Sequence, residues 1–266
     1  MTTLDLTAPD PAGRDTAGAI RPGEVHVWHV PLDGVPRAGR DRFAAALGPQ
    51  ERDRRTAYRT PAARARYTVA HGALRLLLGH FLGIPAPDVR IHRGPLGKPE
   101  LDPAAADAAP DLRFSLSHVH GRALVALTLG RAVGIDLDQP RPGFPLEAFA
   151  RRYFPAPERD LVLSAGPTAA DRERMFLRLW TRKEALVKAA GSRMALGVRQ
   201  PVCGAAGPTS APAQVRPRHP GLHGTWTVQN LPPPGAGPGP PSAASAAVAA
   251  LALSGTDPYR IVTRTA

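Results

Sequence analysis

WTRKEALVK, residues 180–188, is the stretch around which the rest of the chain is organised. On a helix over residues 171–190, six apolar side chains form one broad arc: Met175, Phe176, Leu179, Trp180, Leu186 and Val187. Lys183 projects into the middle of that arc, Glu184 stands on its edge, and Lys188 follows Glu184 by one turn. Because an unpaired charge in a core is costly, these polar ends either reach out to water or line a polar site cut into the core.

The composition indicates a globular protein, built as one large domain or as two small domains packed together. The chain has 266 residues, of which 43% are hydrophobic, so it can bury a sizeable core. A formal charge of +12 predicts an acidic partner, which can be a nucleic acid, an acidic protein or a polyanionic small molecule. Cys203 is the single cysteine, which excludes an intramolecular disulfide and a cysteine-based zinc cluster.

The chain shows no export signal and no membrane span. Its first ten residues carry acidic side chains and no apolar core, and no run approaches the ~20 apolar residues that a spanning helix needs. We therefore expect a cytoplasmic protein without a membrane partner.

Three short segments predict an antiparallel meander: residues 112–118 (LRFSLSH), 123–129 (ALVALTL) and 132–138 (AVGIDLD). In the third segment Asp136 and Asp138 share one face. Two carboxylates at this spacing repel each other unless a cation lies between them, so they form a candidate site for a hard metal ion. The alternative is that an Asp pair at a strand end simply forms a turn.

The remaining pattern predicts two halves. We expect a disordered tail over residues 1–22, an N-terminal half over 23–130 and a C-terminal half over 131–266. Further strands are predicted over residues 25–30, 226–231 and 246–253. Helices are predicted to begin at Asp41 and at Glu158, and another is predicted to end near Gly83. Two Pro/Gly-rich stretches, about 204–220 and 231–242, are expected to be mobile loops.

Basic residues gather ahead of the meander. The segment 51–66 is rich in arginine, and by default such a run is a solvated helix face. Arg66 borders a buried helix face, so we expect it to point at an anionic group. Further on, Gly97 and Pro99 interrupt regular structure around Lys98. Glycine lets a ligand approach the backbone closely, although Gly-Lys-Pro alone is more often a turn.

Four motifs in fixed order, GKPEL, FSLSH, VGIDLD and WTRKEALVK, resemble the 4'-phosphopantetheinyl transferase family of the broad-specificity type, which primes peptide and polyketide synthase carriers. The resemblance runs from about Arg52 to Lys188. It implies an α+β fold, a pseudo-twofold pair of similar α/β halves, each with a small antiparallel sheet packed on helices. It also implies a monomer with coenzyme A as co-substrate and acidic apo carrier proteins as partners.

The resemblance further implies a metal site and the reaction. Asp136, Asp138 and Glu184 would hold Mg²⁺, or Mn²⁺, bridging to the pyrophosphate of coenzyme A. Asp138 stands where many relatives have glutamate. A carrier serine would attack the β-phosphorus, and 3',5'-ADP would leave. Glu184 would take the serine proton, directly or through a metal-bound water, and Lys188 would neutralise or protonate the leaving phosphate.

The residues that would bind coenzyme A follow from the same motifs. Ser117 and His118 would hold phosphate oxygens, and Gly97, Lys98 and Pro99 would bracket the nucleotide. Arg66, together with Arg52 and Arg55, would grip the 3'-phosphate, a task suited to guanidinium forks. The basic surface would steer the acidic carrier protein to the site.

Three rival functions fit less of the sequence. A nucleic-acid-binding protein would explain the charge, but it predicts interleaved aromatics or a reading helix, which this sequence lacks. A carrier-binding relative without turnover is disfavoured by the intact acidic residues and Lys188. A hydrolase using Ser117 and His118 is disfavoured because strand neighbours point to opposite faces and no nucleophile elbow surrounds them.

Overall fold

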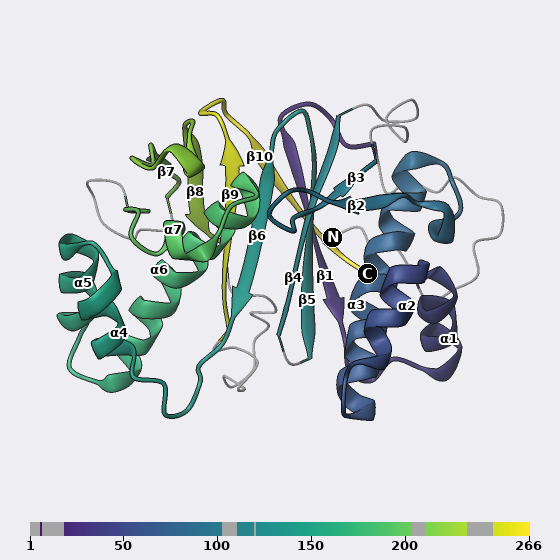
Figure 1. Ribbon diagram of the computed structural model, residues 1–266, viewed down its shortest axis with the longest axis horizontal. Coiled ribbons are helices and arrows are strands. Elements are labelled where there is room, and N and C mark those ends of the chain that lie inside the picture. Colours follow the sequence, from purple (N-terminus) through teal and green to yellow (C-terminus); the bar gives the residue numbers. More distant parts are fainter. Residues whose placement is uncertain (1–5, 7–18, 103–110, 120, 204–210, 233–246) are drawn as a thin grey trace. The chain divides into compact units, whose positions relative to one another are not determined.

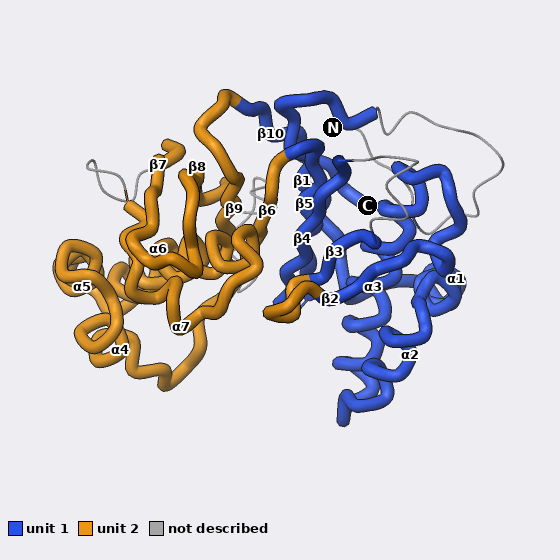
Figure 2. Tube along the Cα trace, turned by 45° about the horizontal axis from the view of Figure 1, so that its top comes forward, with its two compact units in different colours: residues 1–93, 99–130, 259–266 blue, residues 94–98, 131–258 orange. Residues whose placement is uncertain are grey.

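The computed structural model describes residues 6, 19–102, 111–119, 121–203, 211–232 and 247–266. The chain divides into two compact units (Figure 2). Unit 1 comprises Met1–Arg93, Pro99–Gly130 and Tyr259–Ala266, and unit 2 comprises Gly94–Lys98 and Arg131–Pro258.

Unit 1 is built on a mixed four-stranded sheet with the order β10-β1-β5-β4. Its strands are β1 (Glu24–Pro31), β4 (Leu112–Val119), β5 (Arg122–Leu129) and β10 (Arg260–Thr265). Its helices are α1 (Arg37–Ala46), α2 (Pro49–Thr56), α3 (Pro61–Leu82) and the short η1 (Ala86–Asp88), which precedes a small hairpin of β2 (Ile91–Arg93) and β3 (Pro99–Leu101). Strand β1 pairs antiparallel with β5 and parallel with β10. Side chains of α3, β1 and β5, among them Leu77, Trp28 and Val125, form its core.

Unit 2 is built on an antiparallel four-stranded sheet with the order β6-β9-β8-β7. Its strands are β6 (Val133–Asp138), β7 (Ala213–Val215), β8 (Trp226–Asn230) and β9 (Val248–Ser254). Its helices are α4 (Leu146–Tyr153), α5 (Ala156–Leu163), α6 (Ala169–Ala190), α7 (Met194–Gly197) and the short η3 (Pro220–Leu222). Helix α6 packs along β6 and β9 (Figure 1).

The two units repeat one order of elements. Each begins with a strand and continues through helices to one long helix of 22 residues. After further short elements, each unit then supplies two consecutive antiparallel strands, β4 and β5 in unit 1 and β8 and β9 in unit 2. In unit 1 the first strand, β1, pairs with β5, which pairs with β4. In unit 2 the first strand, β6, pairs with β9, which pairs with β8. This arrangement confirms the predicted α+β fold class.

Capping residues explain where the two long helices begin and end. The Thr60 side chain accepts from the backbone N–H of Ala63 at the start of α3, and Thr168 forms a capping box with Asp171 at the start of α6. Both helices stop at a glycine in the left-handed conformation, Gly83 and Gly191. The end predicted near Gly83 is therefore confirmed. Among the described helices, none is both long and apolar enough to cross a membrane.

The predicted three-stranded meander is wrong in its third strand. Strands β4 and β5 pair antiparallel as expected, but β6 pairs with β9 in the other sheet. The chain turns at Gly130, whose φ is 70°. The guanidinium of Arg131 then donates to the carbonyls of Ser254 and Gly255, which ties the start of β6 to the end of β9. Short-range strand patterns carry no information on this distant partner.

Several expectations about mobile segments fall wholly or partly outside the described residues, namely 1–5, 7–18, 204–210 and 233–242. Within the described part, Leu6 and Ile20 are buried in the core of unit 1, although they belong to the expected tail. Similarly, β7 and η3 lie in the stretch 211–222, where a loop was expected to residue 220. Residues 259–266 cluster with unit 1, whereas we expected the C-terminal half to run to residue 266.

Candidate active site

The closeness of β6 and α6 in unit 2 depends on Gly134. A Cβ atom at this position would lie 2.0 Å from the carbonyl oxygen of Ala185 and 2.4 Å from the backbone nitrogen of Ala189. Glycine is therefore required for the helix backbone to approach the strand this closely. Because side chains alternate along a strand, Asp136 and Asp138 share the face of Gly134 and point toward α6.

Asp136 and Lys188 form an ion pair between strand and helix. The Lys188 Nζ donates to the Asp136 Oδ1 at 2.7 Å. The Asp136 carboxyl is nearly buried, whereas the Lys188 side chain keeps 32% of its surface exposed. The pair is therefore reachable from solvent through its ammonium end.

Asp138 has a different cationic neighbour, Arg141, which the sequence patterns did not single out. The Arg141 guanidinium donates to both carboxyl oxygens of Asp138, at 2.9 and 3.1 Å, and the backbone N–H of Gln139 donates at 2.8 Å. Burial nevertheless raises the pKa of Asp138 above its usual range, against the lowering effect of these donors, and the charge of Asp136 adds to the increase.

Glu184 lies one turn before Lys188 and is crowded by the same negative charges. Burial raises the pKa of Glu184 to about 6, and the charge of Asp136 is the second cause, while Lys188 acts in the opposite direction. Within the described part of the chain, the Glu184 side chain makes no hydrogen bond or ion pair. The three carboxylates thus share one electrostatic environment that favours an added positive charge.

The carboxylates suit a magnesium ion in chemistry, but they are not assembled around one point. Among the residues that the structure describes, no group of three or more His, Cys, Asp or Glu side chains is arranged to hold a metal ion. Lys188 and Arg141 hold the two aspartates instead. Since Mg²⁺ in proteins usually takes one or two carboxylates and completes its shell with phosphate and water, the donor set of Asp136, Asp138 and Glu184 fits this ion.

Lys183, in the middle of the apolar arc, neither reaches solvent nor joins this site. Its side chain is fully buried, and its Nζ donates to the Glu158 carboxylate at 2.5 Å and to the Gln200 carbonyl at 2.6 Å. Glu158 also accepts from the backbone N–H groups of Val202 and Cys203. Every charge here has a partner, so this network supports the fold around α5 and α6.

Lys98 lies at the C-terminal end of α6. Its Nζ donates to the carbonyl of Ala189 at 2.8 Å, where the helix dipole favours a positive charge. The preceding Gly97 has a φ of 89°, and its turn closes through the Gly94 N–H, which donates to the Lys98 carbonyl at 2.8 Å. Pro99 begins β3 and belongs to unit 1, whereas Lys98 belongs to unit 2.

In unit 1 two of the three arginines expected to bind phosphate, Arg66 and Arg52, have protein partners. Arg66 on α3 donates to both oxygens of Asp33, at 2.8 and 3.1 Å, and this bidentate bond raises its pKa. Arg52 on α2 donates to the carbonyl of Leu47, and Arg55 is half-buried on the same helix. Arg66 therefore already holds a carboxylate in the way that it would hold a phosphate.

Ser117 and His118 stand at the end of β4 in unit 1. Ser117 is buried and His118 is exposed, so the two neighbours face opposite sides of the strand. The ring of His118 meets His71 edge to face, with 6.3 Å between the ring centroids, and His71 packs on Tyr67. Burial lowers the pKa of His71 to about 3, and the charge of His118 is the second cause. His71 is thus neutral at pH 7 and lies against the exposed imidazole of His118.

Comparison with known proteins identifies the family. A family model described as the 4'-phosphopantetheinyl transferase superfamily matches residues 132–230. The chain is 37% identical over 172 residues to 4'-phosphopantetheinyl transferase HetI of Nostoc sp., an alignment covering 65% of this chain and 70% of that protein. The chain belongs to the 4'-phosphopantetheinyl transferase superfamily. The transferase is also 29% identical to a putative 4'-phosphopantetheinyl transferase of Synechocystis sp., over 65% of this chain and 68% of that protein. With 4'-phosphopantetheinyl transferase of Bacillus subtilis it shares 25% identity, over 64% and 72% respectively.

In each unit the structure shows a partner of a candidate residue that the sequence motifs did not indicate. Arg141 and Asp33 are the present partners of Asp138 and Arg66. Arg141 stands three positions after Asp138, so its spacing was a usable signal, whereas Asp33 is 33 residues from Arg66 and had none. Gly134 was visible inside VGIDLD, but its close approach to α6 becomes apparent only in the fold.

Proposed function

We propose that this transferase moves the 4'-phosphopantetheine group of coenzyme A to a serine of an apo carrier protein, acyl or peptidyl, and releases 3',5'-ADP. One observation carries the proposal: within the segment matched by the family model, Lys188 of α6 contacts Asp136 of β6, and Glu184 lies one turn away. This places a positive and two negative side chains on facing elements, where a diphosphate and a divalent cation can be held together.

Three carboxylates would hold the cation. Asp136, Asp138 and Glu184 supply hard oxygen ligands, which Mg²⁺ requires and Mn²⁺ accepts. When bound, the ion neutralises the pyrophosphate oxygens of coenzyme A. Lys188 and Arg141, which pair with Asp136 and Asp138, would then turn to phosphate oxygens.

The transfer step is a substitution at phosphorus. The serine Oγ forms a bond to the β-phosphorus of coenzyme A, and the bond from that phosphorus to the oxygen bridging the two phosphates breaks. Glu184 takes the serine proton, directly or through a water. The electron pair stays on the α-phosphate of 3',5'-ADP, where Lys188 neutralises or protonates the leaving oxygen. Positioning and charge neutralisation supply most of the rate in such reactions.

The remaining residues would bind the nucleotide part of coenzyme A. Lys98, in its turn with Gly97 and before Pro99, would bracket the nucleotide, and Ser117 with His118 would hold phosphate oxygens. Arg66, together with Arg52 and Arg55, would grip the 3'-phosphate: Arg66 by exchanging the Asp33 carboxylate for the phosphate.

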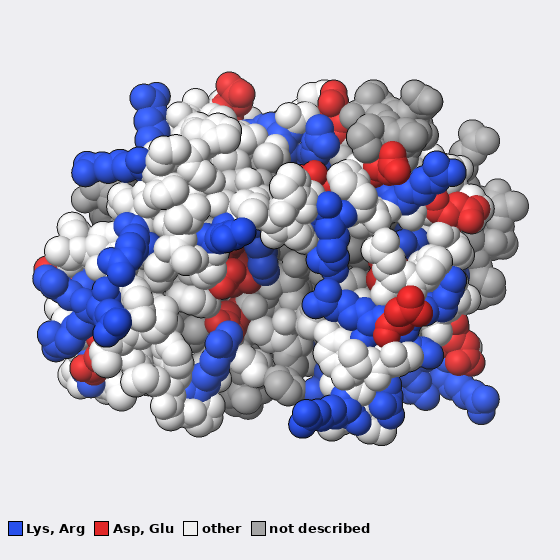
Figure 3. All heavy atoms as spheres, in the orientation of Figure 1, with Lys and Arg blue, Asp and Glu red and all other residues white. Residues whose placement is uncertain are grey.

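The surface charge supports an acidic protein partner. The chain carries 34 Lys and Arg against 22 Asp and Glu, and basic side chains outnumber acidic ones on the face shown in Figure 3. Such a surface steers an acidic carrier protein by long-range attraction. We infer a broad-specificity transferase that acts as a cytoplasmic monomer.

The test is intact-mass analysis of apo carrier proteins incubated with the transferase, coenzyme A and Mg²⁺. A gain of one phosphopantetheine group on the carrier serine is expected, and Glu184→Gln should suppress it. If coenzyme A and a carrier both bind without any mass gain, the chain is a carrier-binding relative without turnover. If coenzyme A does not bind and DNA binding survives moderate salt, the proposal is wrong and a nucleic-acid-binding function replaces it.

A further inference from the structure

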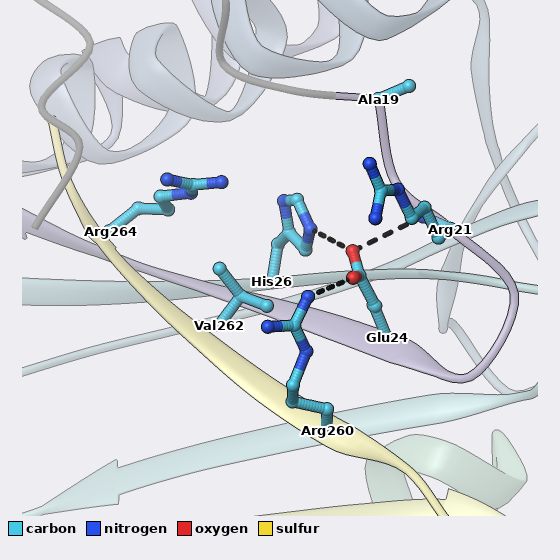
Figure 4. Close-up of a pocket in the computed structure, with 7 residues that line it drawn as sticks. All are labelled: Ala19, Arg21, Glu24, His26, Arg260, Val262 and Arg264. Carbon is cyan, nitrogen blue, oxygen red and sulfur yellow. Dashed lines mark hydrogen bonds and ion pairs between the residues drawn. The ribbon is translucent and has the colours of Figure 1, made fainter.

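Unit 1 contains a cavity, and none of its described lining residues takes part in the proposed transfer. It has a volume of about 350 Å³, which is within the range of small-molecule sites. Three arginines, Arg21, Arg260 and Arg264, line it together with Glu24 and His26 (Figure 4). Its wall therefore holds more charge than an ordinary surface hollow.

The parallel pairing of β1 and β10 builds this cavity. Glu24 is opposite Arg260, and Trp28 is opposite Arg264. On β1, His26 lies between Glu24 and Trp28. Because alternate residues of a strand share a face, these side chains project from the same side of the sheet. Trp28 belongs to the core of unit 1, so the cavity lies directly beside packed structure.

The only carboxylate of this wall is already engaged. Glu24 accepts a hydrogen bond from Arg260, one from the Arg21 backbone N–H at 3.4 Å, and bonds the His26 Nε2 at 3.0 Å (Figure 4). The bond to His26, followed by that to Arg260, lowers the pKa of Glu24 to about 2. Glu24 is thus ionised at neutral pH, and its charge is offset by Arg260.

Two guanidinium groups are left over. Arg264 keeps its Nε buried, and His26, which is 1% exposed, keeps its Nδ1 buried; neither atom has a hydrogen-bond partner within the described chain. The Arg21 side chain also makes no hydrogen bond or ion pair with any described residue. In Figure 4 the guanidinium groups of Arg21 and Arg264 flank the ring of His26. The buried Nε–H of Arg264 is a donor without a partner, which is costly, and an added anion would satisfy it. The Nδ1 of His26 is an acceptor, because the Nε2–H of the ring donates to the Glu24 carboxylate.

We propose that this cavity binds a compact dianionic oxyanion, a free phosphate or the phosphate group of a small ester, through Arg21 and Arg264. Glu24 and Arg260 offset each other, and burial lowers the pKa of His26, which favours its neutral form, so the wall has two positive charges to spare. Guanidinium forks match the tetrahedral oxygens of phosphate in both charge and direction.

Binding would join the first and last strands of unit 1. Arg21 precedes β1, whereas Arg264 is carried by β10, and the strands contributing Glu24 and Arg260 are 236 residues apart in the sequence. A ligand that needs both ends of the chain binds only the folded unit, so it stabilises unit 1 in proportion to its concentration.

The experiment observes the His26 ring by NMR in the full-length protein, because this reports on the cavity and not on coenzyme A binding elsewhere. Inorganic phosphate, glycerol 3-phosphate and succinate are each titrated at constant ionic strength, with sodium chloride as the reference. Phosphate and glycerol 3-phosphate should shift the His26 signals in a saturable way. A response to succinate of equal strength would extend the ligand class to dicarboxylates while keeping the oxyanion site.

Matched variants locate the binding. Arg264→Gln and Arg21→Gln should each weaken phosphate binding at least about 10-fold, the usual effect of losing a charge-assisted hydrogen bond. Arg37→Gln removes the same charge from a side chain that is 89% exposed on α1, and it should bind phosphate like the unaltered protein. Carrier modification should stay unchanged in Arg264→Gln, which separates this site from the transfer reaction. Undiminished phosphate binding in both cavity variants, or no saturable shift of His26, would overturn the proposal.

Discussion

The first strands of the two units occupy the same place in the same topology, yet their acidic side chains differ. In β1, Glu24 has a pKa lowered to about 2, mainly by its hydrogen bond to His26. In β6, burial raises the pKa of Asp138, and that of nearby Glu184 is raised to about 6. Part of the difference comes from the next strand outward: β10 pairs with β1 and brings Arg260, the second cause of the lowered pKa of Glu24, whereas β6 is the outermost strand of its own sheet.

This contrast shows that a repeated fold does not repeat its electrostatics. Unit 1 holds a surplus of guanidinium groups around Glu24, which suits an anion. Unit 2 holds carboxylates that raise each other's pKa, which suits a cation. The polar residues around β1 therefore suit an anion, and those around β6 suit a cation. Both strands are nevertheless followed by the same order of elements, two shorter helices and then a long helix.

The largest effect is expected from removing a negative charge in unit 2. Asp136→Asn should lower carrier modification by about 100-fold or more, because the site loses an oxygen ligand for a cation. The fold should persist, since this side chain is held by Lys188 rather than packed in the core. Intact-mass kinetics and urea unfolding measure the two effects. Glu147→Gln, which removes a half-exposed carboxylate from α4, is the control and should modify the carrier normally. Full activity of Asp136→Asn would remove the cation site from unit 2.

A second change separates β6 from α6 without altering any charge. Gly134→Ala should reduce transfer about 10- to 100-fold and destabilise the protein by about 1–3 kcal/mol, since the helix must move away from the new methyl group. The same assays apply. Gly83→Asn serves as control, because nothing lies within 4 Å of the position and asparagine tolerates its left-handed backbone. If both variants behave alike, the close approach at Gly134 does not position the carboxylates.

A smaller effect tests unit 1 as the anion-binding side. Arg66→Ala should raise the KM for coenzyme A about 10-fold, and much less for dephospho-coenzyme A, which lacks the 3'-phosphate. Asp33→Asn should lower the KM for coenzyme A, because Arg66 then has no carboxylate to give up. Steady-state kinetics with both substrates distinguish these outcomes. Equal effects of Arg66→Ala on the two substrates would contradict the role of Arg66.

The smallest effect concerns stability against pH. The pKa of Glu24 is lowered from 4.5 to about 2 in the folded protein, so the folded state binds its proton less readily than the unfolded state. The stabilisation is fully present above about pH 4.5 and is lost as the pH falls toward 2. Glu24→Gln should therefore be less stable than the parent at pH 6, and the two should converge at low pH. Urea unfolding at several pH values measures this, and a constant difference would show that Glu24 carries no such linkage.

The sequence was informative wherever a local pattern sets local structure. Three such patterns are the apolar arc of residues 175–187, the glycines that end the helices and the strand alternation in VGIDLD. Each depends only on residues close together in the sequence. Hence α6, β6 and the shared face of Asp136 and Asp138 were all predictable. The strand partner of β6 was not, because its alternation fits any sheet with one polar face.

Lys183 and Lys188 show the same division within one helix. Their spacing placed both on α6 near the apolar arc, and nothing in WTRKEALVK distinguishes a structural lysine from one at the site. The distinction comes from partners far away in the chain, Glu158 for Lys183 and Asp136 for Lys188. Only the folded chain brings these groups within hydrogen-bonding distance.

By itself the sequence determined which residues form helices and strands and which faces their side chains occupy, since these depend on periods of two and 3.6 residues. The tertiary structure alone decided which charge each polar side chain meets. Glu24 meets Arg260 because the last strand returns to pair with the first, and Asp136 meets Lys188 because α6 packs along β6. Pairing across such separations depends on the packing of whole elements, which no local period encodes.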